Sequence, residues 1–183
     1  MINAQFEEGM RISRQNFGET EDGKEVLLFT LRNTNGIIVS ITNYGGIISS
    51  ILLPGRFGAY DNVVLGFRRF KDYISEVYLS SYPYLGAICG RYVGRIRDGK
   101  FSINGTDYQL AQNDGPNHVH GGLQVYSGYY TPELNGKYGR YGGIALETQH
   151  LPDSPNHPGF PDTILMPGEV YNENTLFKFI VDA

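Results

Sequence analysis

The sequence predicts an all-β protein, folded as an antiparallel sandwich or barrel. The chain of 183 residues contains 24 glycines and 14 tyrosines, a composition typical of strands connected by many turns. Its apolar runs are short and rich in strand-forming residues, and only one segment could form a helix. Asn-Gly, the strongest short-range signal for a β-hairpin, divides two pairs of these runs.

The expected strands are short and follow one another along the chain. They comprise residues 24–31, 37–41, 47–53, 62–66, 101–103, 106–110, 144–147 and 175–181. Asn35-Gly36 and Asn104-Gly105 supply the two hairpin turns. Residues 68–75 are the only expected helix. Residues 152–167 are expected to form an irregular loop, because proline cannot donate to a sheet ladder.

Charge and composition exclude several classes of protein. The net charge of −4 does not fit a nucleic-acid-binding surface. The chain contains no run of about 18 apolar residues, so we expect no membrane-spanning helix. Residues 1–10 lack the basic and apolar parts of a secretory signal, and the single cysteine cannot form an internal disulfide. A cytoplasmic location is therefore expected, with Cys89 as a small packing residue.

A few polar residues could carry chemistry. In an extended segment His118 and His120 would share one side, as a pair of metal ligands must, but no carboxylate follows at short range, so we expect no metal. Glu147 could be a general base at a strand end or simply an exposed strand residue. Arginines in residues 90–95 could bind sugar hydroxyls or form structural ion pairs, and this glycine-rich stretch matches no nucleotide-binding fingerprint.

Several motifs occur in a distinctive order. They are residues 43–48 (NYGGII), 62–67 (NVVLGF) with Tyr73, 84–91 (YLGAICGR) running to Ile96, 113–122 (NDGPNHVHGG), 123–128 (LQVYSG), 145–158 (ALETQHLPDSPNHP), and 167–169 (PGE) with Tyr171. Together they resemble, in the same order, the motifs of the aldose 1-epimerase (galactose mutarotase) family. The resemblance covers nearly the whole chain and implies an antiparallel β-sandwich of the galactose mutarotase-like type.

The resemblance also implies a reaction and a set of site residues. Family members interconvert the α and β anomers of free aldohexoses such as galactose and glucose, without a metal, nucleotide or organic cofactor. Glu147 would be the general base and His120 a ligand of a sugar oxygen. Arg95 and Gln124 would bind sugar hydroxyls. Gly94 stands where the family has an asparagine, so one sugar contact is expected to be lost.

The chain departs from the family pattern between Gly122 and Leu123. A long stretch of the family, with the general-acid histidine and a substrate-binding aspartate, is absent there. Residues 1–122 and 123–183 are thus expected to be the N-terminal and C-terminal parts of a single, incomplete β-sandwich domain. The absence predicts impaired catalysis, so the alternatives are a non-catalytic carbohydrate-binding module and a truncated remnant. Strand edges left unpaired could be covered in a homodimer.

Overall fold

The computed structural model describes residues 11–81, 84–90, 92–122 and 146–180. These residues form two compact units. The N-terminal unit comprises residues 11–81 and 84–88, and the C-terminal unit comprises the described residues from 89 onward.

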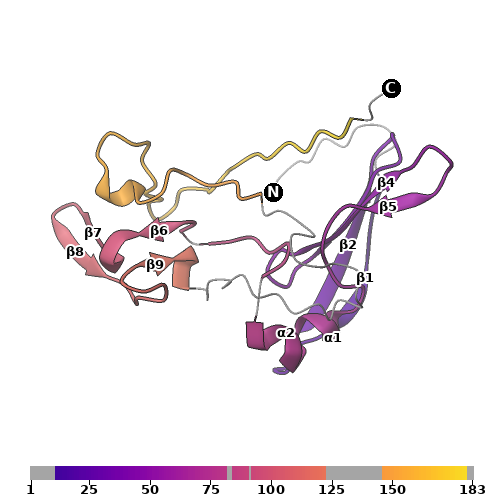
Figure 1. The fold of residues 1–183 in the computed structure, drawn as a ribbon, viewed down its shortest axis with the longest axis horizontal. Helices are drawn as coiled ribbons and strands as arrows, with labels where there is room; N and C mark the ends of the chain where they lie inside the picture. The colour runs from indigo at the N-terminus through magenta and orange to yellow at the C-terminus, as the bar shows by residue number, and fades with distance from the viewer. Residues whose placement is uncertain (1–10, 82–83, 91, 123–145, 181–183) are drawn as a thin grey trace. The chain divides into compact units, whose positions relative to one another are not determined.

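A five-stranded antiparallel sheet forms most of the N-terminal unit (Figure 1). Its strands are β1 (Arg11–Glu19), β2 (Glu25–Arg32), β3 (Ile38–Thr42), β4 (Ile48–Pro54) and β5 (Tyr60–Asn62), and they pair in chain order. Each connection is short enough for a hairpin. Between β2 and β3, Gly36 has a φ of 83°, a conformation that glycine adopts without steric cost, which explains the position of the Asn35-Gly36 turn.

Aromatic side chains make the core of the N-terminal unit. Two short helices, α1 (Phe70–Tyr73) and α2 (Glu76–Ser81), lie side by side at one end of the sheet (Figure 1). Tyr73 is fully buried, and its ring lies edge-on to Phe67 and Tyr78, with centroid distances of 4.9 and 5.9 Å. The Tyr73 hydroxyl accepts a hydrogen bond of 2.9 Å from the Phe67 N–H, so the buried polar atom is satisfied.

The C-terminal unit contains two small sheets and three 3₁₀ turns. Strand β6 (Arg95–Ile96) pairs with β9 (His118–Val119), and β7 (Lys100–Ile103) pairs with β8 (Thr106–Gln109). The 3₁₀ turns are η1 (Arg97–Gly99), η2 (His120–Gly122) and η3 (Ser154–Asn156). Turn η3 packs on β6 and β7. Asn104 and Gly105 connect β7 to β8 with φ angles of 50° and 77°, the left-handed pair that a tight hairpin requires.

The structure confirms the predicted all-β, antiparallel class and both Asn-Gly hairpins. It corrects the position of one strand: residues 62–66 were expected to form it, but β5 ends at Asn62. The Asn62 carboxamide accepts hydrogen bonds from the N–H groups of Ile51 and Val64 and donates to the Val64 carbonyl. Val63 still donates its N–H to the Ile51 carbonyl of β4, and Val64 then bonds to the Asn62 side chain instead of a neighbouring strand.

Three further expectations are corrected. A second helix, α2, follows the one expected within residues 68–75. Strands were expected at 144–147 and 175–181, of which residues 144, 145 and 181 lie outside the described residues. Residues 146–147 and 175–180 lie outside any strand. Their sequences favour an extended chain, but within the part of the chain that the structure describes they have no ladder partner, and an isolated strand gains too little to persist. None of the described helices is long and apolar enough to cross a membrane.

Candidate functional site

The pairing of β6 with β9 brings together Arg95 and His120, two of the four predicted site residues. Arg95 begins β6, and His120 immediately follows β9. The His120 N–H donates to the Gly94 carbonyl (3.0 Å), and the Gly94 N–H donates to Nδ1 of His120 (3.3 Å). His120 is therefore attached to the residue before Arg95 by both its backbone and its ring.

The hydrogen bond to Nδ1 determines which tautomer the His120 ring adopts. A nitrogen that accepts an N–H cannot carry a proton of its own, so the neutral imidazole is protonated on Nε2. The free edge of the ring thus presents an N–H donor. The side chain of His120 is 18% exposed, so part of it is open to a ligand.

The two histidines do not lie on one side of an extended segment, as the sequence had suggested. His120 has a φ of 50°, which ends β9 and begins η2. His118 is buried, and its Nδ1 lies 2.7 Å from the Ala111 carbonyl oxygen, a structural contact. Among the described residues, no group of three or more His, Cys, Asp or Glu side chains could hold a metal ion.

Glu147 lies beside His120. Its Oε1 is 3.9 Å from His120 Nε2, close enough for attraction and too far for a direct hydrogen bond. The Glu147 side chain is 43% exposed, so its carboxylate can reach a ligand. Cys89 lies within reach of the Glu147 charge. Burial, and then that negative charge, raise the pKa of the Cys89 thiol, which disfavours a nucleophilic thiolate.

Arg95 is tied to a neighbouring carboxylate. Its Nε lies 2.6 Å from Oδ2 of Asp114, and about half of its side chain is exposed. One edge of the guanidinium is thereby fixed in orientation, while its remaining N–H groups are the donors that could meet a sugar. Gln124, the fourth predicted site residue, lies outside the described residues.

Gly94 occupies a position where a side chain would have to compete for space. Its φ is 83°, and a Cβ placed on it would lie 2.9 Å from Oε1 of Gln149. The amide of Gln149 thus fills the volume next to Gly94, two residues after Glu147. Sequence reasoning missed Gln149, because nothing in its local pattern distinguishes it from an ordinary loop glutamine.

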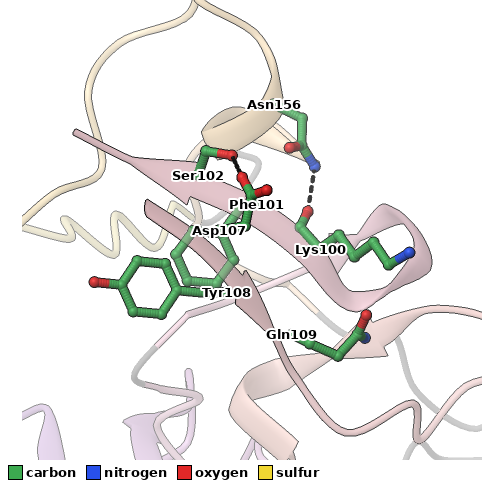
Figure 2. Close-up of a pocket in the computed structure, with 7 residues that line it drawn as sticks. All are labelled: Lys100, Phe101, Ser102, Asp107, Tyr108, Gln109 and Asn156. Atoms are coloured by element: carbon green, nitrogen blue, oxygen red, sulfur yellow. Dashed lines mark hydrogen bonds between the residues drawn. The ribbon is translucent and has the colours of Figure 1, made fainter. Parts of the chain in front are cut away.

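A separate groove of about 330 Å³ follows the β7–β8 hairpin. Figure 2 shows its lining residues, which are Lys100, Phe101, Ser102, Asp107, Tyr108, Gln109 and Asn156. The Phe101 and Tyr108 rings stack with centroids 5.2 Å apart. Most polar groups in the groove are already bonded within the protein: Ser102 donates to Asp107, Gln109 to three carbonyls and Asn156 to the Lys100 carbonyl. These bonds stabilise the hairpin, and neither Glu147 nor His120 lines the groove.

Comparison with known proteins matches the chain to a family model described as aldose 1-epimerase, over residues 27–127 and 122–178. The two stretches overlap at residues 122–127, and the predicted junction between Gly122 and Leu123 stays a prediction. The galactose mutarotase of Sus scrofa is 34% identical over 115 residues, covering 63% of this chain and 32% of its own. The aldose 1-epimerase of Streptococcus thermophilus is 33% identical over 137 residues, covering 70% of this chain and 36% of its own.

A third relative, the aldose 1-epimerase of Lactobacillus helveticus, is 35% identical over 62% of this chain and 80% of its own length. The solved structure of a galactose 1-epimerase from Lactobacillus acidophilus NCFM aligns with 61% of this chain and 30% of its own, at 28% identity and a TM-score of 0.48. The chain thus spans about a third of the length of the Sus scrofa and Streptococcus relatives.

Proposed function

Because the chain belongs to the aldose 1-epimerase family, we propose that it binds a free aldohexose, such as galactose or glucose, and interconverts its α and β anomers. The observation that carries this proposal is the contact of 3.9 Å between Glu147 Oε1 and His120 Nε2. It places a carboxylate and an N–H donor within reach of one small ligand, in one compact unit.

The reaction needs these two kinds of group. A base removes the proton of the anomeric hydroxyl, the bond between C1 and the ring oxygen breaks, and the ring oxygen gains a proton. The open-chain aldehyde rotates about its C1–C2 bond and closes by the reverse steps. The anomeric hydroxyl lies close to the other oxygens on that side of the sugar, so a base for this hydroxyl and a donor to a sugar oxygen beside the ring oxygen must lie close together, as Glu147 and His120 do.

Each site residue then has a specific role. Glu147 is the base that takes the anomeric proton. His120 donates its Nε2–H to a sugar oxygen beside the ring oxygen, and its tautomer suits that role. Arg95 binds sugar hydroxyls through the N–H groups that Asp114 leaves available, and Gln124 adds a polar contact.

The proton for the ring oxygen must come from another acid, because the stretch that carries the family's general-acid histidine is absent. The exposure of Glu147 allows water to enter and serve as that acid. A positioned acid is typically worth about 10²–10⁴-fold in rate. We therefore expect acceleration of mutarotation that is weaker than that of a longer relative by about this factor.

The test is polarimetry of freshly dissolved α-D-galactose with and without the purified chain, with Sus scrofa galactose mutarotase as a positive control. Glu147→Gln should remove the acceleration, because the amide cannot take the anomeric proton. Glu169→Gln is the matched control, since Glu169 accepts a hydrogen bond from Met166, only three residues away, and Gln can accept it too. Equal rates for the Glu147→Gln variant and the unaltered chain would refute the role of Glu147.

A second candidate, carbohydrate binding without catalysis, is favoured by the family stretch that the sequence motifs predict to be absent between Gly122 and Leu123. It predicts that galactose shifts NMR resonances of His120 while polarimetry shows no acceleration. If galactose neither binds nor mutarotates faster with a folded sample, both functions are excluded and the chain is a remnant.

A further inference from the structure

We propose that Asp153 is a positioning residue, which holds the segment carrying Glu147 against β6 and thereby sets the distance between Glu147 and His120. The proposal rests on the proposed function only for its effect on catalysis. Its structural part concerns how two side chains, 27 positions apart in the sequence, come to lie 3.9 Å from each other.

The Asp153 carboxylate binds several groups at once. Its Oδ1 accepts the Arg97 N–H at 2.9 Å and the Asn156 side-chain amide at 2.7 Å. Its Oδ2 lies 3.3 Å from Nε2 of His157 and 3.7 Å from Nη2 of Arg97. The side chain is only 15% exposed, so these contacts are largely shielded from water.

The backbone around Asp153 adds two more attachments to the same stretch of chain. The Asp153 N–H donates to the Arg95 carbonyl at 2.9 Å, and the Ser154 N–H donates to the Tyr92 hydroxyl at 3.0 Å. Ser154 is buried. Turn η3 is therefore fixed to residues on both sides of Gly94.

A third attachment comes from Asn156. Its amide donates to the Lys100 carbonyl at 2.9 Å, as Figure 2 shows. Because the Asn156 amide also donates to Asp153, it connects the carboxylate to β7. These attachments involve Tyr92, Arg95, Arg97 and Lys100, which all lie between residues 92 and 100.

Residues 92–100 also bind His120, through Gly94. Gly94 binds the backbone and the ring of His120, so β6 connects the histidine on one side with η3 on the other. Residues 146–150 are exposed and lie outside any helix or strand. Glu147 is six residues before Asp153, so the attachments at Asp153 limit where Glu147 can lie.

The backbone of Asp153 guides the choice of variants. Its φ is 60° and its ψ is 21°, a left-handed conformation that Asn and Gly tolerate and Ala does not. Asp153→Gly removes the side chain without adding backbone strain. Asp153→Asn keeps an acceptor for Arg97 and Asn156 but removes the charge. Asp162→Asn is the matched control, because Asp162 is exposed and, within the described part of the chain, accepts a local hydrogen bond from the Ile164 N–H, two residues away.

The first measurement does not depend on activity. It follows the Cε1–H resonance of His120 by NMR, assigned with His120→Gln. Glu147→Gln should shift this resonance in the unaltered chain and in the Asp162→Asn background. The same change should produce little or no shift in the Asp153→Gly background. Asn156→Ala, which removes the amide between Asp153 and β7, should reduce the shift and serves if the glycine variant does not fold.

The second measurement is mutarotation of α-D-galactose. Asp153→Gly should lower kcat about 10²-fold, the effect of a misplaced catalytic group, with little change in KM, while Asp153→Asn should stay within a few-fold of the unaltered chain. The unaltered chain could prove inactive while Glu147→Gln shifts the His120 resonance in it but not in Asp153→Gly. In that case the positioning role is supported and the proposed function fails. The positioning role is overturned if Glu147→Gln shifts the resonance equally with and without Asp153, or fails to shift it at all. An active chain that keeps its full kcat in Asp153→Gly would overturn it as well.

Discussion

The two units of this chain are stabilised by different interactions. In the N-terminal unit the buried residues are mainly apolar or aromatic, among them Val26, Ile51, Phe70 and Tyr73. Among the described residues of the C-terminal unit, Ile96 and Val119 are the only buried large apolar side chains, and His118 and Ser154 are buried polar residues. The C-terminal unit depends instead on hydrogen bonds between polar side chains and the backbone.

Val119 illustrates the second kind of stabilisation. Its N–H donates to Oδ1 of Asn113 at 2.8 Å, and its carbonyl accepts from Nδ2 of Asn113 at 3.1 Å. One side chain thus supplies both bonds that a neighbouring strand would otherwise make. Such contacts fix individual backbone groups in place but bury little apolar surface, so they specify a site more than they add to its stability.

The largest effect that we expect follows from removing the central ring of the N-terminal unit. Tyr73→Ala should lower the free energy of unfolding of that unit by about 3–5 kcal/mol, because the surrounding rings cannot collapse into the space. Urea unfolding followed by circular dichroism measures the loss, and hydrogen exchange of β2 to β4 assigns it to this unit.

Tyr108→Ala is the matched control in the C-terminal unit. Tyr108 stacks on Phe101 but is 44% exposed, so its removal should cost no more than about 1 kcal/mol. Similar losses for the two variants would contradict the contrast between the units.

A smaller effect is expected from acid on the C-terminal unit. Burial alone would raise the pKa of Asp153, but the Arg97 N–H, the Asn156 amide and the charges of Arg97 and His157 outweigh it and hold this pKa below its ordinary value. The contribution of the ionised Asp153 carboxylate to the free energy of unfolding is therefore fully present above the pKa of an unfolded aspartate, about 3.9. It is lost as the pH falls through the lower pKa of the folded state.

Urea unfolding between pH 7 and pH 3 checks this pH dependence, by comparing the free energies of unfolding of the unaltered chain and of Asp153→Asn. At neutral pH the unaltered chain should be more stable by about 1–2 kcal/mol, since charge-assisted hydrogen bonds are lost in the variant. The two stabilities should converge toward pH 3. A difference that stays constant over this range would show that the Asp153 charge contributes nothing.

The smallest effect concerns the only thiol in the chain. Burial and the charge of Glu147 both raise the pKa of Cys89. Glu147→Gln removes only the second cause, so it should lower the pKa modestly and increase the rate of alkylation by iodoacetamide at a fixed pH below the pKa. Glu169→Gln should leave the rate unchanged. An unaltered pH profile in Glu147→Gln would show that the carboxylate does not lie near Cys89.

Much of the fold could be predicted from local sequence. The Asn-Gly turns predicted both hairpins, because left-handed backbone is adopted by Gly36 in the first and by both Asn104 and Gly105 in the second. The family match confirms the predicted galactose mutarotase-like type of the all-β fold. Helix α2 was missed, although Ser75 carries a signal for it: its Oγ accepts the Tyr78 N–H three residues on, as an N-cap does.

The missed features depend on partners that local sequence does not reveal. Residues 175–180 have the apolar pattern of a strand, yet Leu176 is 90% exposed. The motifs selected Glu147, His120 and Arg95, and the structure places the first two side by side, while their chemical roles remain predictions. Asp153 was not selected, because its importance lies in contacts with residues far away in the sequence.

The order of the strands has a consequence for the sequence of folding events. In the N-terminal unit each strand pairs with its chain neighbour, so these contacts close short loops and are expected to form early. The contacts from Asp153 to Arg97 and from Ser154 to Tyr92 join residues 56 and 62 positions apart. During synthesis on the ribosome, the five-stranded sheet can therefore form before residues 151–157 emerge, and the arrangement around Glu147 is completed last.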